Sequence, residues 1–476
     1  MNYLRRISKA IDLTMAELQG SGDPHARGRY LSERAAIEAS EGRKAEACRL
    51  YLEALALFRS KRRHDSLLSE AGVACSLYNL GYREQGRDIL DRMGDADLRQ
   101  IIFADLVTDA AKAGDISEAI GLLGEVRDLK LRAEVAAGIC LQAGSGGAGD
   151  TGSLLEELEA GAAGLEPGSL IKVLCHLAKA RHHLGQDGQA AGMLAKGRAA
   201  LEAVTGLAGS WLAADTLVQA HIELGLNEEA KGLVTDLLKR MVEARLVMED
   251  ENSDEQKLLG GALYSSFVRV ASRLAGIGED DLVEGMITFL EGKKHQDIGR
   301  LYIGEEYAKA GYLDRAGDMA NMLSGVQQAI LETRIASRLI TDGRIKEARR
   351  LLARTIKTAI KNGYFVVLRD AALELHRLNH KGDSARNLMK KAHQLARQKR
   401  KAGYNVCFWP GFFGRIGAFP AALILAYKVN DLERRLDMLQ ELRDMAAEYE
   451  RGRGPRAWRR SVVKGPETPE PDQPPR

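Results

Sequence analysis

Apolar residues recur along this chain at the three- and four-residue spacing that is typical of amphipathic helices. Near the start, Leu4, Ile7, Ile11, Met15 and Leu18 fall on one helical face, and charged residues interrupt every apolar run between them. The same spacing returns over residues 431–449 and in many segments between these two. The pattern therefore predicts helices through most of the chain, with amphipathic helices at residues 1–20 and 431–449.

A second pattern marks where these helices turn. It consists of a glycine, a small residue five positions later, and then an apolar helix. Glycine at the end of a helix can adopt a positive φ and cap it, and a small residue lets two helices approach closely. Each copy therefore predicts a helix hairpin. The copies are Gly42 with Ala47, Gly81 with Gly86, Gly114 with Ala119, Gly185 with Ala190, Gly225 with Ala230, Gly311 with Ala316, and Gly343 with Ala348. A weaker copy has His380 with Ala385.

The spacing of these turns indicates a repeat. Successive turns lie 32 to 40 residues apart, except for two intervals of 71 and 86 residues. Each long interval has room for one degenerate unit, with turns expected at Gly149 and Gly276. A hairpin of this length cannot bury both of its faces, whereas stacked copies share a continuous core. The sequence thus predicts an all-α solenoid of about ten stacked hairpins.

The best copy of the unit resembles the tetratricopeptide repeat. Ile303, Gly304 and Tyr307 match the first helix of that family, Gly311 its turn and Ala316 its second helix. This chain differs from the family in its variable unit length and in lacking the proline after the second helix. The resemblance implies a right-handed superhelix of antiparallel hairpins. It also implies that protein or peptide partners bind along a concave face made by the first helices.

Three segments interrupt the repeat and define the expected organisation. A glycine-rich stretch is expected to form a loop or hinge, an aromatic-rich stretch follows the last repeats, and a proline-rich tail is expected to be disordered. The expected parts are N-terminal repeats over 1–141, the glycine-rich loop over 142–153, central and C-terminal repeats over 154–403, the aromatic segment over 404–420, terminal helices over 421–451 and the tail over 452–476.

The aromatic segment holds the candidate partner-binding residues Phe408, Trp409, Phe412 and Phe413. Two interpretations stay open. The cluster forms either a hydrophobic plug against the last repeat, with Phe419 opening the next first helix, or an exposed aromatic recognition site, since aromatic residues dominate interface hot spots.

Motifs for catalysis or cofactor binding are not supported by their surroundings. Gly144, Gly146 and Gly149 have the spacing of a dinucleotide loop, but Asp150 stands where a phosphate loop needs lysine. A histidine cluster at positions 176, 182, 183 and 221 has no recognised ligand spacing. The five cysteines are isolated from one another, which indicates small buried side chains. We therefore expect no catalytic, cofactor or metal site.

Charge and hydropathy narrow the function further. With 69 basic and 66 acidic residues, the formal net charge is +3, which gives no strong field for nucleic acid or membrane. No apolar run approaches the roughly 20 residues that span a bilayer, so we expect a cytoplasmic protein. The sequence favours a non-enzymatic interaction scaffold. The alternatives are a ligand-sensing regulatory solenoid and, less favoured because the unit length varies, a nucleic-acid-binding helical repeat.

Overall fold

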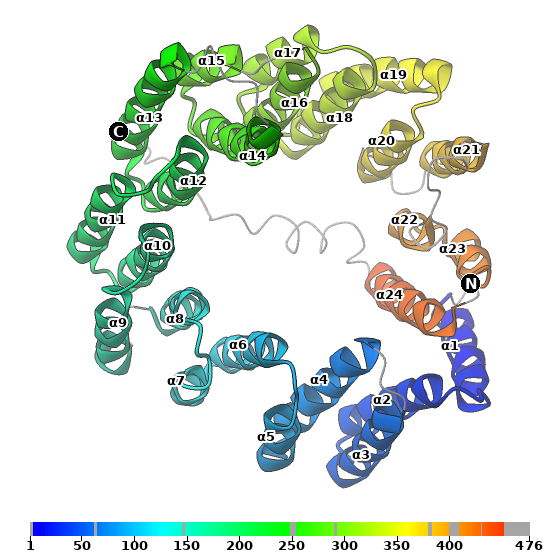
Figure 1. Cartoon of the computed structure of the whole chain (residues 1–476). Helices are drawn as coiled ribbons and strands as arrows, with labels where there is room; N and C mark the ends of the chain where they lie inside the picture. The colour runs from blue at the N-terminus through cyan, green and yellow to red at the C-terminus, as the bar shows by residue number, and fades with distance from the viewer. Residues whose placement is uncertain are drawn as a thin grey trace, which may run out of the picture. The chain divides into compact units, whose positions relative to one another are not determined.

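The structure, a computed structural model, describes residues 3–60, 64–144, 148–247, 254–289, 293–378, 383–398, 409–429 and 431–451. These residues form 24 α-helices and no β-strand, which confirms the all-α prediction (Figure 1). Among the described residues, none of the helices has the length and apolar content needed to cross a membrane.

The chain divides into two compact units. Unit 1 joins two separate stretches, Met1–Val73 and Ala336–Arg476, and unit 2 is Ala74–Ile335. Unit 1 contains α1 (Tyr3–Gln19), α2 (Pro24–Ser40), α3 (Lys44–Ser60), α19 (Ile345–Asn362), α20 (Phe365–Leu378), α21 (Asp383–Gln398), α22 (Trp409–Arg415), α23 (Phe419–Ala426) and α24 (Leu432–Glu450). The unit limits fall within α4 (His64–Asn79) and α18 (Gly325–Thr341).

Unit 2 is built from consecutive helix pairs. Its helices are α5 (Arg83–Asp91), α6 (Ala96–Lys112), α7 (Ile116–Leu123), α8 (Leu129–Ala143), α9 (Ala148–Ala162), α10 (Pro167–His183), α11 (Asp187–Leu201), α12 (Leu207–Glu223), α13 (Asn227–Val247), α14 (Asp254–Gly276), α15 (Asp280–Phe289), α16 (Lys293–Ala310) and α17 (Leu313–Met322). The even-numbered helices are here called first helices and the odd-numbered ones second helices. From α6 to α16 each first helix packs against the second helix that follows it, and from α6 to α14 each also packs against the next first helix. Along unit 2 the first helices share one side and the second helices the other (Figure 1). This is an α-solenoid-like helical-repeat architecture.

The turns between paired helices have one geometry. Each of the seven turn glycines of the sequence pattern has a positive φ, between 74° and 97°. In each, the amide after the glycine donates to a carbonyl five residues back, as Gln186 N–H does to Arg181 at 2.8 Å. This bond satisfies a carbonyl at the end of the first helix, and the positive φ it needs favours glycine. The five alanines paired with the glycines at positions 114, 185, 225, 311 and 343 are fully buried.

Close helix contact explains two further glycines. A Cβ at Gly86 would lie 2.8 Å from the carbonyl oxygen of Ala74, so α5 approaches the backbone of α4 closely. A Cβ at Gly304 would lie 2.5 Å from a methyl group of Leu331. Both distances are shorter than real Cβ contacts, so a Cβ at either position would require a neighbour to shift: the backbone of α4 at Gly86, and the Leu331 side chain of α18 at Gly304.

Two turns differ from their predicted places. The turn between α14 and α15 is at Gly278, with φ 82° and the buried Val283 five residues later, not at Gly276 with Asp281. Gly149 lies inside α9, which begins at Ala148. The expected loop over 142–153 is therefore shorter, because α8 extends to Ala143 and residues 148–153 are helical. Residues 145–147 lie outside the described residues.

The aromatic-rich segment is a hairpin, not an interruption. Gly417, with φ 66°, joins α22 to α23, and Ala422 follows five residues later with no exposed surface. The Ala418 amide donates to the carbonyl of Phe413 at 2.8 Å, which is the bond seen at the other turns. The segment is a further copy of the repeat, and Phe419 opens its second helix instead of a new first helix. His380 and the tail at 452–476 lie outside the described residues.

Candidate protein-interaction face

The aromatic residues singled out in the sequence lie mostly inside unit 1. Trp409 and Phe413 are buried, with 5% and 2% of their surfaces exposed, and the Trp409 ring packs 5.0 Å from that of His393. Phe412 is half-buried, and the guanidinium of Arg369 stacks 4.4 Å above its ring. Phe408 lies outside the described residues. The described aromatic side chains thus form the core of the α22–α23 hairpin and present no large exposed aromatic patch.

Exposed apolar side chains gather instead on the first helices of unit 2. Ile101 on α6 and Leu212 on α12 are about half exposed, and each lies thirteen residues before its turn glycine. Leu141 on α8 and Tyr302 on α16 are exposed to a similar degree. Among the described residues of the unit-2 second helices, Met322 at the end of α17 is the one large apolar side chain so exposed. Unit 2 therefore carries most of its exposed apolar surface on its first helices.

A groove lies between α14 and α16 on this side. It encloses about 440 Å³ and is lined by Ser265, Val268, Arg269, Ser272, Arg273, Tyr302 and Glu306. Tyr302 adds an exposed aromatic ring, while the two arginines add hydrogen-bond donors. The groove thus combines an apolar surface with convergent polar groups, which is the composition of recognition sites on proteins.

A buried carboxylate positions both arginines. The Nε groups of Arg269 and Arg273 donate to the two oxygens of Asp215 on α12, at 2.6 and 2.9 Å. Arg273 also donates through Nη2 to Gln219, and Arg269 through Nη2 to Ser266. Charge-assisted bonds of this kind hold guanidinium groups in fixed orientations. Both arginines pair with Asp215, while Glu306 forms an ion pair with Lys309, so the groove offers oriented donors.

In the predicted histidine cluster, the rings of His182 and His183 have centroids 6.0 Å apart, while His221 is on another helix. Burial lowers the pKa of His176, of His183 and of His221, so these rings are biased toward the neutral form. His221 Nδ1 lies 2.8 Å from the carbonyl oxygen of Leu217, and His182 is bound to Asp187. Within the described residues, no three His, Cys, Asp or Glu side chains are grouped as metal ligands would be.

The described cysteines are not activated. Burial raises the pKa of Cys75 and Cys140 to about 11 and that of Cys175 to about 12. Thiols with raised pKa values stay protonated at neutral pH and are poor nucleophiles. Cys48 is also buried, and Cys407 lies outside the described residues.

Sequence reasoning missed the groove for a physical reason. Asp215 and its arginine partners are 54 and 58 residues apart, on helices that meet only when two hairpins stack. The exposed apolar positions did have a sequence signal, because Ile101 and Leu212 recur at the same repeat position, where a solvent-facing residue would ordinarily be polar.

Comparisons with known proteins give no family. No protein-family model matches the chain, and no curated protein sequence is significantly similar to it. Among solved structures, Ton1535 from Thermococcus onnurineus NA1 aligns at 11% identity and a TM-score of 0.20, over 72% of this chain and 98% of that one. A circular tandem repeat protein with a novel repeat topology aligns at 14% identity and a TM-score of 0.19, over 96% and 98%. Scores this low carry no inference about fold or function.

Proposed function

We propose that the protein is a non-enzymatic scaffold that binds a protein or peptide partner on the first-helix face of unit 2. One observation carries this proposal: most of the exposed large apolar side chains in the described part of unit 2 are on its first helices, and one of them, Tyr302, lines a groove with oriented arginines. Exposed apolar side chains rimmed by polar groups are typical of protein-interaction surfaces. The resemblance to tetratricopeptide repeats supports the same face, because partners of that family bind along the first helices.

The finer architecture belongs to this proposal. We infer a right-handed, tetratricopeptide-like superhelix of about ten contiguous hairpins whose first helices line a concave face, in a cytoplasmic protein. The turn glycines and the close helix contact at Gly304 support the hairpin unit. Small-angle scattering combined with circular dichroism tests it. The expected result is a helix-rich spectrum and a radius of gyration above the ~23 Å of a compact globule of this length.

The binding face is tested with two matched variants. Leu212→Lys places a charge on first helix α12, and Met322→Lys places one on second helix α17. Both side chains are about half exposed, so both variants should keep stability within about 0.5 kcal/mol. Each full-length variant is used for affinity capture from native cytosol with quantitative mass spectrometry. A specific partner should be lost with Leu212→Lys and retained with Met322→Lys. Partners that bind both variants equally would contradict the proposal.

A second candidate function is a ligand-sensing module, favoured by the groove between α14 and α16. Its volume is within the ~300–1,000 Å³ range of small-molecule sites. Equilibrium dialysis of the full chain against a cytosolic metabolite extract tests this function. A compound enriched by the natural chain and lost with Arg269→Gln would favour sensing. Absence of any enriched compound, together with partner loss in Leu212→Lys, would favour the scaffold.

A further inference from the structure

The first and last described helices pack against each other in unit 1. On α1, five apolar side chains are buried along one face, namely Ile7, Ala10, Ile11, Met15 and Leu18. On α24, the buried positions include Leu436, Leu439, Leu442 and Ala446. The two helices are in contact with each other, and α24 also contacts α22 and α23. Two segments more than 400 residues apart in the sequence therefore share one apolar core.

The two helices run antiparallel, like the two helices of a hairpin. At one end, Arg435 near the start of α24 donates through Nη1 to Glu17 near the end of α1, at 2.9 Å. At the other end, the ring of Phe419 lies between those of Tyr3 and Tyr449, at 5.4 and 5.8 Å. The end of α24 and the beginning of α1 thus lie near each other, at the place where other hairpins have their turn.

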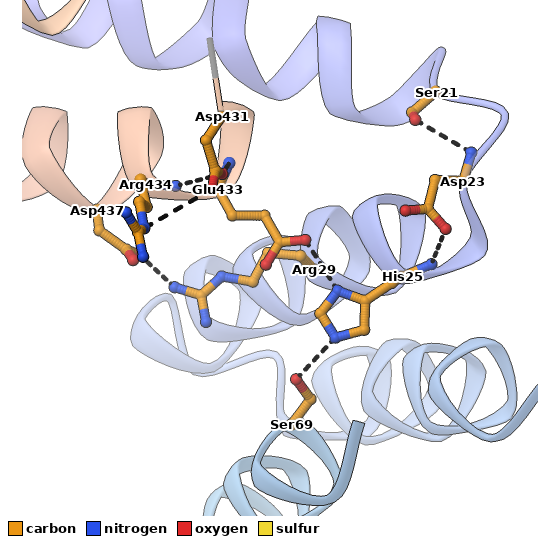
Figure 2. A network of polar contacts seen from close by, with 9 residues as sticks. All are labelled: Ser21, Asp23, His25, Arg29, Ser69, Asp431, Glu433, Arg434 and Asp437. Carbon is orange, nitrogen blue, oxygen red and sulfur yellow. Dashed lines mark hydrogen bonds and ion pairs between the residues drawn. The ribbon is translucent and has the colours of Figure 1, made fainter. Parts of the chain in front are cut away.

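The neighbours of this pair complete the repeat pattern. On one side α24 contacts α22 and α23, the preceding hairpin, and on the other side it contacts first helix α2. The contact with α2 is polar (Figure 2). His25 Nδ1 lies 2.8 Å from Oε1 of Glu433, and Arg29 donates to Asp437. Farther along the same two helices, Gln440 donates to Glu33 at 2.6 Å. In this arrangement α24 occupies the place of a first helix and α1 that of its second helix.

We infer that α24 and α1 together form one repeat, here called the composite repeat. In it, each of the two stretches of unit 1 covers the terminal apolar face of the other. A solenoid ordinarily leaves an uncovered apolar face at each terminal repeat and needs a polar cap there. Here α1 covers α24, and α24 in turn covers α2. The stability of the hairpin α22–α23 and of α24 therefore depends on α1, although α1 comes more than 400 residues earlier in the sequence.

Hydrogen exchange of the full chain, followed by mass spectrometry, tests this dependence. Ile7→Ala removes a fully buried side chain from α1, and the matched control Leu194→Ala removes one from second helix α11. Ile7→Ala should speed exchange at least ten-fold in residues 409–451. Leu194→Ala should speed exchange in α10 to α12 and leave residues 409–451 unchanged. If Ile7→Ala does not fold, Ile7→Val provides the same comparison with a smaller effect.

The reciprocal variant completes the test. Leu439→Ala in α24 should speed exchange in α1 as well as in α24, because each helix is the other's cover. The inference is overturned if Ile7→Ala speeds exchange in α1 while residues 409–451 exchange as in the natural chain. It is equally overturned if Leu439→Ala leaves α1 unchanged, since α1 would then lie on α24 without sharing its stability.

Discussion

The contiguous hairpin α10–α11 and the composite hairpin α24–α1 each pair two helices, but they differ in how those helices are joined. In the first, Gly185 adopts φ 74° and a single turn links the two helices. In the second, the described helices meet through apolar faces, the Arg435–Glu17 ion pair and the rings around Phe419. The composite unit therefore pairs its helices without a turn glycine between them. In a contiguous hairpin the turn glycine joins two helices that follow each other in the chain, so the hairpin can be recognised from the sequence.

The first helices α10 and α24 also differ in how each contacts the next first helix, α12 or α2. Each of these helix–helix contacts is here called a seam. The seam between α10 and α12 contains the ion pair Lys179–Glu223 beside an apolar core. The seam between α24 and α2 has three polar contacts, and His25 of α2 also contacts Ser69 of α4. Polar contacts near a surface contribute little and are screened by salt. The contact of α24 with α2 should therefore respond more strongly to ionic strength than the contact of α10 with α12 does.

The largest effect is expected from the aromatic core beside the composite repeat. Replacing both Trp409 and Phe413 with Ser should cost about 3–5 kcal/mol for each side chain, because both are buried. Chemical denaturation should show the loss, and hydrogen exchange should place it in α22 to α24 and in α1. An unchanged denaturation midpoint would mean that the aromatic pair is an exposed site after all.

A matched pair of leucines compares the two hairpins directly. Leu436 on α24 and Leu177 on α10 both have no exposed surface. Each Leu→Ala change should lower the free energy of unfolding by about 2–5 kcal/mol, measured by urea denaturation. Comparable losses would show that the composite core is as well packed as the contiguous one. A loss below about 1 kcal/mol for Leu436→Ala alone would show that α24 is loosely held.

The turn of the contiguous hairpin should contribute a smaller amount. Gly185→Ala forces a Cβ into a left-handed backbone conformation, at a cost of about 1–2 kcal/mol. No atom lies within 4 Å of the added Cβ, so the cost comes from the backbone alone. The control is Gly188→Ala, inside helix α11 and equally unobstructed, which should be neutral or slightly stabilising. Equal thermal unfolding of the two variants would refute the assigned turn.

The smallest effect is expected from salt. Raising ionic strength from about 0.1 to 1 M shortens the screening length from ~10 to ~3 Å and should cost less than about 1 kcal/mol for each exposed pair. Exchange in α24 should accelerate a few-fold, and that in α10 should change less. In the variant Asp437→Asn the salt response of α24 should shrink. If salt accelerates hydrogen exchange more in α10 than in α24, the expected difference between the two seams is wrong.

Much of the fold could be predicted because its turns require glycine. Positive φ selects that residue at Gly114 or Gly311, and the buried alanine follows from close helix packing. The turn at Gly278 was misplaced because Gly276 competes with it and Val283 fills the place of the small residue. Gly417 was missed because its hairpin lies in an aromatic run that conceals the pattern.

The composite repeat and the groove could not be predicted from the sequence. The amphipathic faces of residues 1–20 and 431–449 were visible, but an apolar face does not specify which distant face covers it. No turn glycine connects these two helices in the sequence. The hydrogen bond between Asp215 and Arg269 likewise joins residues that come together only when two hairpins stack. Such long-range contacts have no periodic signature along the chain.

The most direct test of the composite repeat is a zero-length cross-link. Arg435→Lys places a primary amine opposite Glu17, where the natural ion pair is 2.9 Å long. Carbodiimide treatment of the full chain joins amines to carboxylates in contact. The native pairs Lys196–Glu159 and Lys179–Glu223, at 2.5 and 2.6 Å, serve as internal standards for unit 2. The account predicts an intramolecular cross-link from position 435 to Glu17, formed as readily as the standards. Formation of both standards without the 435–17 cross-link would contradict it.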